Sequence, residues 1–496
     1  MGIVINQSIK NSISFYFGMF FGAISTVFVY PNVFNDEPEH WGLIQLIVSY
    51  SFIISTFSNL GIPKTFIRFF PIIKNKAKLY FFSFLFIFSG YIIFLIISLI
   101  YKDWFFQLIS ASPLLVDKFY IVYFLVLIIS IYELFVSISR SNLNSTLPTF
   151  LNETFLKSYN LFVLILHGLK LLSFDQFLFF YVGGYLVKLI VISYSQFKTN
   201  NINLIPNLNG INVIELFQFG LFVIAGGASA MLVSRLDMVM IGKFMSLKYV
   251  AFYSVAFYIG NAIKVPARSV VAISDPIVSK AWKKNDIKLI KNIYYKSSIN
   301  QLIIGGIFFV CVWLSIDDIF SLLPKKFSGG KLVVFFIGLS QLFNVGMGAN
   351  GAIIVHSRYY KFDLYSNLFL LVITFLSNYI FIQESSPLKN LGIYGINGAA
   401  FATSLSIFLF NLIKFLFILI KVKIHPFSFK TIYTILLLFL VYFIVDAIAL
   451  NLNPYLNIIL KSIISLIIFV PIILYAKLSL ELLSIYQNIK KKLWLL

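Results

Sequence analysis

Two pairs of cationic residues recur in the sequence with the same spacing, each beside a proline. Lys64 and Arg68 are four residues apart, and so are Lys264 and Arg268. On a continuous helix, residues four apart lie on one face, so each pair could bind an anionic group. The alternative is that these side chains mark the cytoplasmic ends of helices and extend to the lipid headgroups. The proline adds a further alternative, because it could end the helix near each pair.

A second set of charged residues falls inside or near long apolar stretches, where a Lys or Arg near the bilayer centre costs about 2.5–3.5 kcal/mol. The lysines of this set are Lys170, Lys188, Lys414 and Lys461. Its carboxylates are Glu133, Asp237 and Asp446. The lysines could line a deeper cavity, and the carboxylates could bind a coupling proton or sodium ion. Structural pairing is the alternative for each member, and Arg235 is a nearby partner for Asp237.

The signatures of catalysis and of nucleotide hydrolysis are missing from the sequence. The stretch Gly329-Gly330-Lys331 lacks the upstream glycine and the following hydroxyl residue of a phosphate-binding loop. The four histidines are scattered over different segments, so the sequence predicts no metal cluster. There is also no G-x-S-x-G turn. We therefore expect neither an enzyme nor a bound cofactor.

The elements that position these residues are predicted by composition. Of the 496 residues, 60% are hydrophobic and 11% are charged, with a mean hydropathy of +0.93. Soluble chains carry about a quarter charged residues, so this is an all-α polytopic membrane protein, with spans of roughly 20 residues. Apolar windows predict about fourteen spans: 11–31, 42–62, 79–100, 118–138, 158–172, 177–197, 214–234, 249–268, 297–316, 332–353, 364–382, 393–420, 431–450 and 456–478.

The distribution of basic residues predicts the orientation of these spans. Connections on the side of the N-terminus hold 24 of the 39 Lys and Arg residues, and the opposite connections hold eight. Because Lys and Arg accumulate in cytoplasmic loops, both termini should be cytoplasmic. The net charge of +21 then indicates loops that face anionic lipid rather than a nucleic-acid partner. The lysine-rich segment 280–296 is expected to form an amphipathic helix on the cytoplasmic leaflet.

An internal repeat is indicated by matching features about 200–215 residues apart. The two cation pairs follow the second and eighth spans. Gly183-Gly184 precedes Lys188 in the sixth span, and Gly398-Ala399-Ala400 precedes Lys414 in the twelfth. This offset predicts two pseudo-symmetric six-helix lobes, residues 1–200 and 201–425, followed by two additional helices and a basic tail in 426–496.

Three parts of the sequence carry a resemblance to a known family. The first is Asp237-Met-Val-Met-Ile-Gly-Lys-Phe, then Val250-Ala-Phe-Tyr-Ser-Val-Ala with Pro266 and Pro276-Ile-Val-Ser. The second is Trp41-Gly-Leu with Gly61 and Arg68-Phe-Phe-Pro, and the third is Gly392-Ile-Tyr-Gly-Ile-Asn-Gly-Ala-Ala-Phe-Ala-Thr. These stretches resemble polysaccharide exporters and lipid-linked oligosaccharide flippases of the multidrug/oligosaccharidyl-lipid/polysaccharide (MOP) superfamily, and the resemblance covers nearly the whole chain.

The resemblance implies a V-shaped pair of six-helix lobes that works by alternating access in the bacterial inner membrane. The substrate would be an undecaprenyl-pyrophosphate-linked oligosaccharide of the O-antigen type, whose diphosphate the two cation pairs could hold. Membrane lipids, H⁺ or Na⁺ and other polysaccharide-assembly proteins would be its partners. The alternatives are an ion-coupled multidrug antiporter of the same superfamily, a membrane-embedded glycan polymerase or ligase, and a channel. The short outer connections carry no Arg-rich or His-rich cluster, which disfavours the polymerase or ligase.

Overall fold

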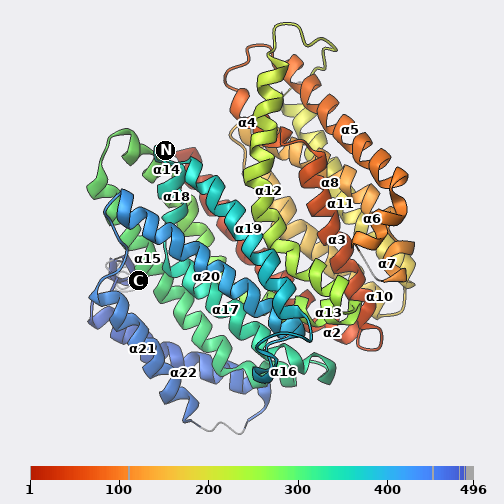
Figure 1. Cartoon of the computed structure of the whole chain (residues 1–496). Coiled ribbons are helices and arrows are strands. Elements are labelled where there is room, and N and C mark those ends of the chain that lie inside the picture. Colours follow the sequence, from red (N-terminus) through yellow and green to blue (C-terminus); the bar gives the residue numbers. More distant parts are fainter. Residues whose placement is uncertain are drawn as a thin grey trace, which may run out of the picture. The chain divides into compact units, whose positions relative to one another are not determined.

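The computed structural model describes residues 2–109, 112–200, 202–448, 452–479, 481–484 and 486–487. Within these ranges the chain is helical and contains no strand (Figure 1). Eleven described helices or helical runs are long and apolar enough to cross a membrane. They are Lys10–Val33, Pro38–Ser58 (α3), Lys76–Ile100 (α5), Tyr120–Ser141 (α8), Phe174–Asn200 (α11), Ile287–Leu314 (α15), Lys325–Gly346 (ending with α17, Lys331–Gly346), Lys361–Ile382 (α19), Gly395–Lys421 (α20), Phe429–Asp446 (α21) and Pro454–Tyr475 (α22). The all-α polytopic prediction is therefore confirmed.

The three other predicted spans coincide with helices that are interrupted or unusually long. The fifth, 158–172, overlaps α10 (Leu156–Gly168), which continues from α9 (Thr146–Thr149) and a π-helical segment (Phe150–Phe155). The seventh lies in α12 (Val213–Phe244), and the eighth is divided into α13 (Leu247–Asn261), a 3₁₀ turn (Ala262–Lys264) and α14 (Val265–Lys283). The count of fourteen spans thus stays a prediction.

Polar side chains mark where several of the long helices begin. The side chain of Asn212 accepts a hydrogen bond from the backbone N–H of Glu215 at the start of α12. Asp286 caps α15 in the same way through Leu289, and Ser428 with Thr431 forms a capping box at the start of α21. Such caps satisfy the unpaired N–H groups of a first helical turn.

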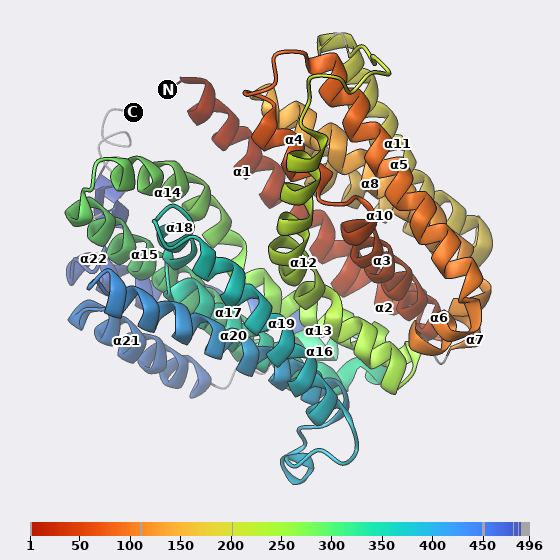
Figure 2. The ribbon, with the colours of Figure 1, turned by 45° about the horizontal axis from the view of Figure 1, so that its top comes forward.

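The chain forms two compact units. Unit 1 contains residues 1–255 and 367–399, and unit 2 contains residues 256–366 and 400–496. In unit 1, α3 packs against α8 and α12, and the short helix α4 (Ile62–Phe69) packs against α5, α8 and α12 (Figures 1 and 2). Unit 2 is organised around α15, which contacts α14, α17, α21 and α22. The division into 1–200, 201–425 and 426–496, which follows the sequence repeat, stays a prediction.

The expected amphipathic helix over 280–296 is wrong. The helix α14 ends at Lys283, and α15 begins at Ile287 after a turn. Asn285 has a φ of +52°, a left-handed conformation that interrupts the helix, and Asp286 caps the next one. The segment therefore joins two long helices, and its apolar residue Tyr294 is buried inside unit 2.

Candidate functional site

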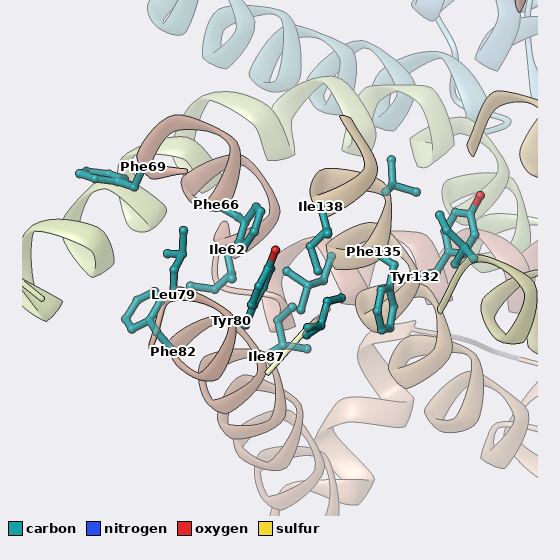
Figure 3. Packing of buried hydrophobic residues seen from close by; sticks show 14 of the residues in the cluster. Ile62, Phe66, Phe69, Leu79, Tyr80, Phe82, Ile87, Tyr132, Phe135 and Ile138 are labelled. Carbon is teal, nitrogen blue, oxygen red and sulfur yellow. The ribbon is translucent and has the colours of Figure 1, made fainter. Parts of the chain in front are cut away.

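The first cation pair lies on α4, which presents one apolar and one cationic face. Ile62, Phe66 and Phe69 are buried and pack into a core formed with α5 and α8 (Figure 3). Lys64 and Arg68 are exposed on the other side of the same continuous helix. The proline of this pair is in the first turn of the helix, where its missing N–H costs nothing. The sequence expectation that both cations share one face is therefore correct for this pair.

A close contact between two glycines holds the start of α4 against α12. Gly61 has a φ of +70°, which favours glycine, and a Cβ there would overlap the carbonyl oxygen of Gly220. Conversely, a Cβ added to Gly220 would lie 2.5 Å from the carbonyl oxygen of Leu60. The guanidinium of Arg68 also lies over the ring of Phe219, 4.4 Å from its centroid. The position of the cationic face is thus fixed by backbone packing and by a cation–π contact.

The second cation pair follows a similar interruption between two helices. Lys264 is half-buried at the end of the 3₁₀ turn that separates α13 from α14. Pro266 lies in the first turn of α14, as Pro63 does in α4. The backbone of Arg268 continues α14, but its side chain lies outside the described residues. Both pairs therefore lie where one helix has ended and a proline marks the start of the next, although Pro63 precedes Lys64 whereas Pro266 lies between Lys264 and Arg268.

Asp237 on α12 is buried and is the centre of a polar cluster within unit 1. The hydroxyl of Tyr253 on α13 donates to Asp237 Oδ2. Asn378 Nδ2 on α19 donates to Asp237 Oδ1 at 3.1 Å. The other amide atom, Asn378 Oδ1, is buried and has no hydrogen-bond partner among the described residues. The sequence singled out Asp237 but not its two donors, which are ordinary residue types in apolar helices.

Arg235 does not act as the local partner of Asp237. Its guanidinium lies over the ring of Phe52 on α3, 5.2 Å from the centroid. Residues two apart on a helix lie on different faces, which explains why the two side chains have different neighbours. Within the described part of the chain, Arg235 has no ion pair.

Lys188 on α11 is buried, with 2% of its surface exposed, and it has specific partners. Its ammonium donates to Asn152 Oδ1 at 2.8 Å and lies 4.0 Å from the ring centroid of Tyr132. It also interacts electrostatically with Glu133. These contacts join α8, α11 and the π-helical segment of unit 1. They give Lys188 and Glu133 a structural role, as an alternative to the expected roles in a cavity and in ion binding.

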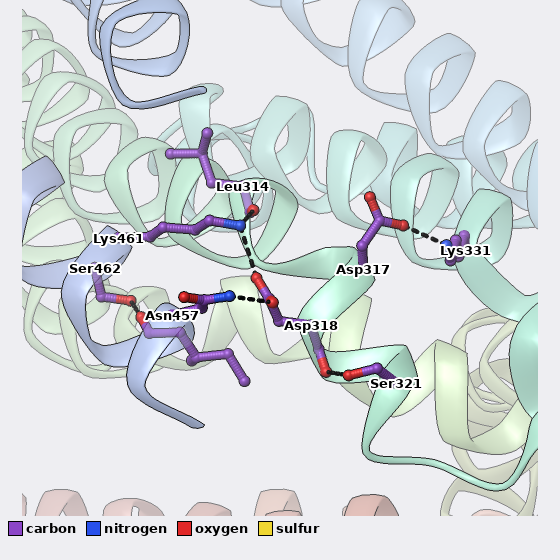
Figure 4. A network of polar contacts seen from close by, with 9 residues as sticks. Leu314, Asp317, Asp318, Ser321, Lys331, Asn457, Lys461 and Ser462 are labelled. Carbon is purple, nitrogen blue, oxygen red and sulfur yellow. Dashed lines mark hydrogen bonds and ion pairs between the residues drawn. The ribbon is translucent and has the colours of Figure 1, made fainter. Parts of the chain in front are cut away.

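Two other lysines within long helices form ion pairs inside unit 2. Lys414 on α20 is 5% exposed and lies 2.7 Å from Asp363 Oδ1. Lys461 on α22 lies 2.6 Å from Asp318 Oδ2 and also donates to the carbonyl of Leu314 (Figure 4). Asp318 belongs to α16 (Ile316–Ser321), a short helix that follows α15. Both lysines therefore have the partner that a charge in lipid requires.

Two predicted deep charges are at helix ends. Lys170 follows the end of α10 at Gly168 and is exposed, with a φ of +60°. Asp446 is the last residue of α21 and is also exposed. The expectation that these two residues lie deep in apolar helices is corrected, because both helices end earlier than the apolar windows 158–172 and 431–450.

Unit 2 also contains an apolar cavity of about 870 Å³ that sequence reasoning missed. It lies between α15, α17 and α21, and Phe309, Trp313, Phe343 and Phe439 are among its lining residues. Such a lining can accept a hydrocarbon chain but offers few polar groups to a hydrophilic ligand. No sequence pattern indicated this cavity, because apolar residues dominate every long helix.

Comparison with known proteins places this geometry in a structural class. No family model and no curated protein matches the sequence. The fold is that of transporters of the MOP superfamily. The structure is similar to the lipid II flippase MurJ in an inward closed conformation, with a TM-score of 0.71 and 16% identity over 96% of this chain and 99% of that one.

Multidrug transporters share the same fold at lower similarity. An inward-facing multidrug resistance MATE family transporter has a TM-score of 0.63 and 12% identity, over 82% of this chain and 94% of that one. An outward-facing MATE transporter has a TM-score of 0.56 and 12% identity, over 85% and 95%. These neighbours are transporters and flippases rather than enzymes, and at such identities they establish the fold alone.

Proposed function

We propose that this protein is a flippase that moves an undecaprenyl-pyrophosphate-linked oligosaccharide from the inner to the outer leaflet of the bacterial inner membrane. It would supply cell-surface polysaccharide assembly, including O-antigen or lipopolysaccharide, and would work by alternating access with both termini in the cytoplasm. The main supporting observation is the exposed cationic face of α4, held by Gly61 on a scaffold with a flippase fold.

The substrate diphosphate would bind to the two cation pairs. Lys64 and Arg68 are exposed on one helical face, and an Arg with a Lys offers several charge-assisted hydrogen bonds to phosphate oxygens. Lys264 and Arg268 would provide the equivalent groups from the second half of the sequence. In this proposal, each pair binds the anionic part of the substrate from its own unit.

The apolar cavity of unit 2 favours a lipid-linked substrate over a small hydrophilic one. Its aromatic and aliphatic walls fit part of an isoprenoid chain. The coupling ion, H⁺ or Na⁺, would bind at Asp237, where Asn378 Oδ1 provides a second oxygen without a hydrogen-bond partner among the described residues. Glu133 is a second candidate carboxylate for the ion, and Lys188 beside it a candidate cavity charge.

The test removes each cation pair and measures export of the polysaccharide in cells that lack their own copy of the gene. K64A/R68A and K264A/R268A should each abolish export while the amount of protein in the membrane stays at the wild-type level. The matched control K284A/K288A removes two exposed lysines at the turn between α14 and α15, on the side that we predict to be cytoplasmic, and should leave export intact. Full complementation by both pair variants would favour the headgroup-contact interpretation instead.

An ion-coupled multidrug antiporter is the second candidate, because MATE transporters have the same fold. Such a protein would accumulate organic cations in proteoliposomes when an ion gradient is imposed. A flippase would instead move a fluorescent undecaprenyl-pyrophosphate saccharide between leaflets and leave the organic cation untransported. Measuring both substrates with one purified preparation separates the two functions.

A further inference from the structure

A second, polar cavity of about 560 Å³ lies at one end of unit 2. Three connections meet there: the turn between α14 and α15, the segment after α18 (Asn350–Val355), and the end of α20. These connections are far apart in the sequence, and the distribution of basic residues predicts that all three are cytoplasmic. The structure confirms that they share one end of the unit.

The cavity is lined by cations that have no acidic partner in the part of the chain that the structure describes. Lys283, Arg358 and Lys421 all line it, and no carboxylate among the described residues lies within 4.0 Å of their charged nitrogens. His356 also lines the cavity, 3.9 Å from Asp275. The other nearby carboxylate, Asp286, is engaged by the backbone N–H at the start of α15.

The residues that line this cavity belong to segments that pack against one another. Trp282 Nε1 donates to the carbonyl of Ile353 at 3.0 Å, which ties α14 to α18. Arg358 donates to the hydroxyl of Tyr359 at 2.7 Å. Trp282 and Val422, which line the cavity, pack against a buried apolar cluster that includes Val278 and Ile418. Lys283 and Lys421 thus lie at the ends of packed helices, and Arg358 lies in the turn between α18 and α19.

We propose that this cavity binds a phosphate group. Lys283, Arg358 and Lys421, which form no ion pair with a described residue, provide the charge from three separate segments, and Ser279 and Asn285 provide neutral hydrogen-bonding groups in the same lining. The apolar side chains Trp282 and Val422 complete the wall, as suits the headgroup and glycerol region of an anionic phospholipid. The same charge would also hold inorganic phosphate, so the two sources share one chemistry. The site lies wholly within unit 2, and none of the four cations proposed to bind the substrate lines it.

The test measures binding to the purified full-length protein in a zwitterionic detergent. The probes are dihexanoyl phosphatidylglycerol, the zwitterionic dihexanoyl phosphatidylcholine and inorganic phosphate, and native mass spectrometry and thermophoresis give the dissociation constants. K283Q/R358Q/K421Q removes the three cavity charges. K280Q/K284Q/K288Q removes three exposed lysines from the same region that do not line the cavity, so it has the same net charge.

We expect the cavity variant to bind the anionic probes at least tenfold more weakly and the control less than twofold more weakly. The single variant R358Q, expected to weaken binding about threefold, serves if the triple variant does not fold. Tighter binding of phosphatidylglycerol than of inorganic phosphate by wild type identifies a lipid headgroup, and equal binding identifies free phosphate. Equal losses in both triple variants, or binding of phosphatidylcholine as tight as that of phosphatidylglycerol, would overturn the proposal.

Discussion

Asn378 donates its side-chain amide to Asp237 across 141 residues of sequence, with a distance of 3.1 Å between Nδ2 and Oδ1. This hydrogen bond joins α19 to α12, and the hydroxyl of Tyr253 satisfies the other carboxylate oxygen from α13. A change in the charge or ligand of Asp237 would therefore alter contacts among α12, α13 and α19. This geometry is suited to a group that couples ion binding to helix movement.

Replacing Asp237 with Asn should remove gradient-driven transport. The carboxylate accepts hydrogen bonds from Tyr253 and Asn378, and an amide in its place cannot provide the negative charge that binds a cation or proton. In proteoliposomes with an imposed pH or sodium gradient, we expect transport by D237N to fall at least tenfold and to lose its dependence on the gradient. The control D175N alters an exposed carboxylate that pairs with Lys118 and should transport normally. Unchanged gradient-dependent transport by D237N would remove Asp237 from the mechanism.

The orientation can be tested by labelling two exposed turns. In a C311S background, D36C lies between the first two spans and K284C between α14 and α15. Because basic residues accumulate in the cytoplasm, an impermeant maleimide should label D36C in intact cells and K284C only after permeabilisation. Labelling of K284C from outside would reverse the predicted orientation.

Substituting Gly61 should destabilise unit 1 more than substituting a glycine of similar conformation elsewhere. An alanine with positive φ costs about 1–2 kcal/mol, and at Gly61 the overlap with Gly220 adds about 1–3 kcal/mol. Gly210 provides the control, since its φ is +80° and a Cβ added there would meet nothing within 4 Å. Thermal unfolding in detergent should show a larger loss for G61A than for G210A. Equal losses would mean that the contact between α4 and α12 relaxes at no cost.

Asp318 should make a stabilising contribution that depends on pH. Burial would raise the pKa of Asp318, but hydrogen bonds from Lys461 and Asn457 outweigh it and hold the pKa below its usual value of 3.8. A lowered carboxyl pKa stabilises the fold above the unfolded-state value, and this contribution is lost as the pH falls through the folded-state value. The destabilisation caused by D318N should therefore be present at pH 7 and shrink below about pH 4.

The neighbouring residue Asp317 is a matched control for this effect. Its side chain is 80% exposed and pairs with Lys331 (Figure 4), whereas the side chain of Asp318 is 13% exposed. Exposed pairs contribute about 0–1 kcal/mol, and charged hydrogen bonds in a buried setting about 1.5–3 kcal/mol. The free energy of unfolding in detergent should fall more for D318N than for D317N. A pH-independent loss in D318N would assign the effect to packing rather than charge.

How far the sequence predicts the site can be judged from α4. The spacing of Lys64 and Arg68 predicted a shared face, and the structure confirms it because the proline starts the helix instead of ending it. The predicted ends of the spans that contain Lys170 and Asp446 were wrong. Leucine and isoleucine continue in the sequence beyond the ends of α10 and α21, so hydropathy does not mark where these helices end. Where a helix stops depends on turns such as the one at Lys170.

Composition and hydropathy are enough to establish an all-α membrane protein, since lipid offers backbone groups no hydrogen bonds and long apolar stretches must become helices. The same sequence patterns identify the charges that need partners in lipid. The partners themselves emerge only from the packed helices: Asn152 for Lys188, Asp363 for Lys414 and Asp318 for Lys461. The reason is physical. A partner is set by the rotation and depth of two packed helices, and nearly uniform apolar surfaces leave no periodic signal in the sequence from which that rotation can be read.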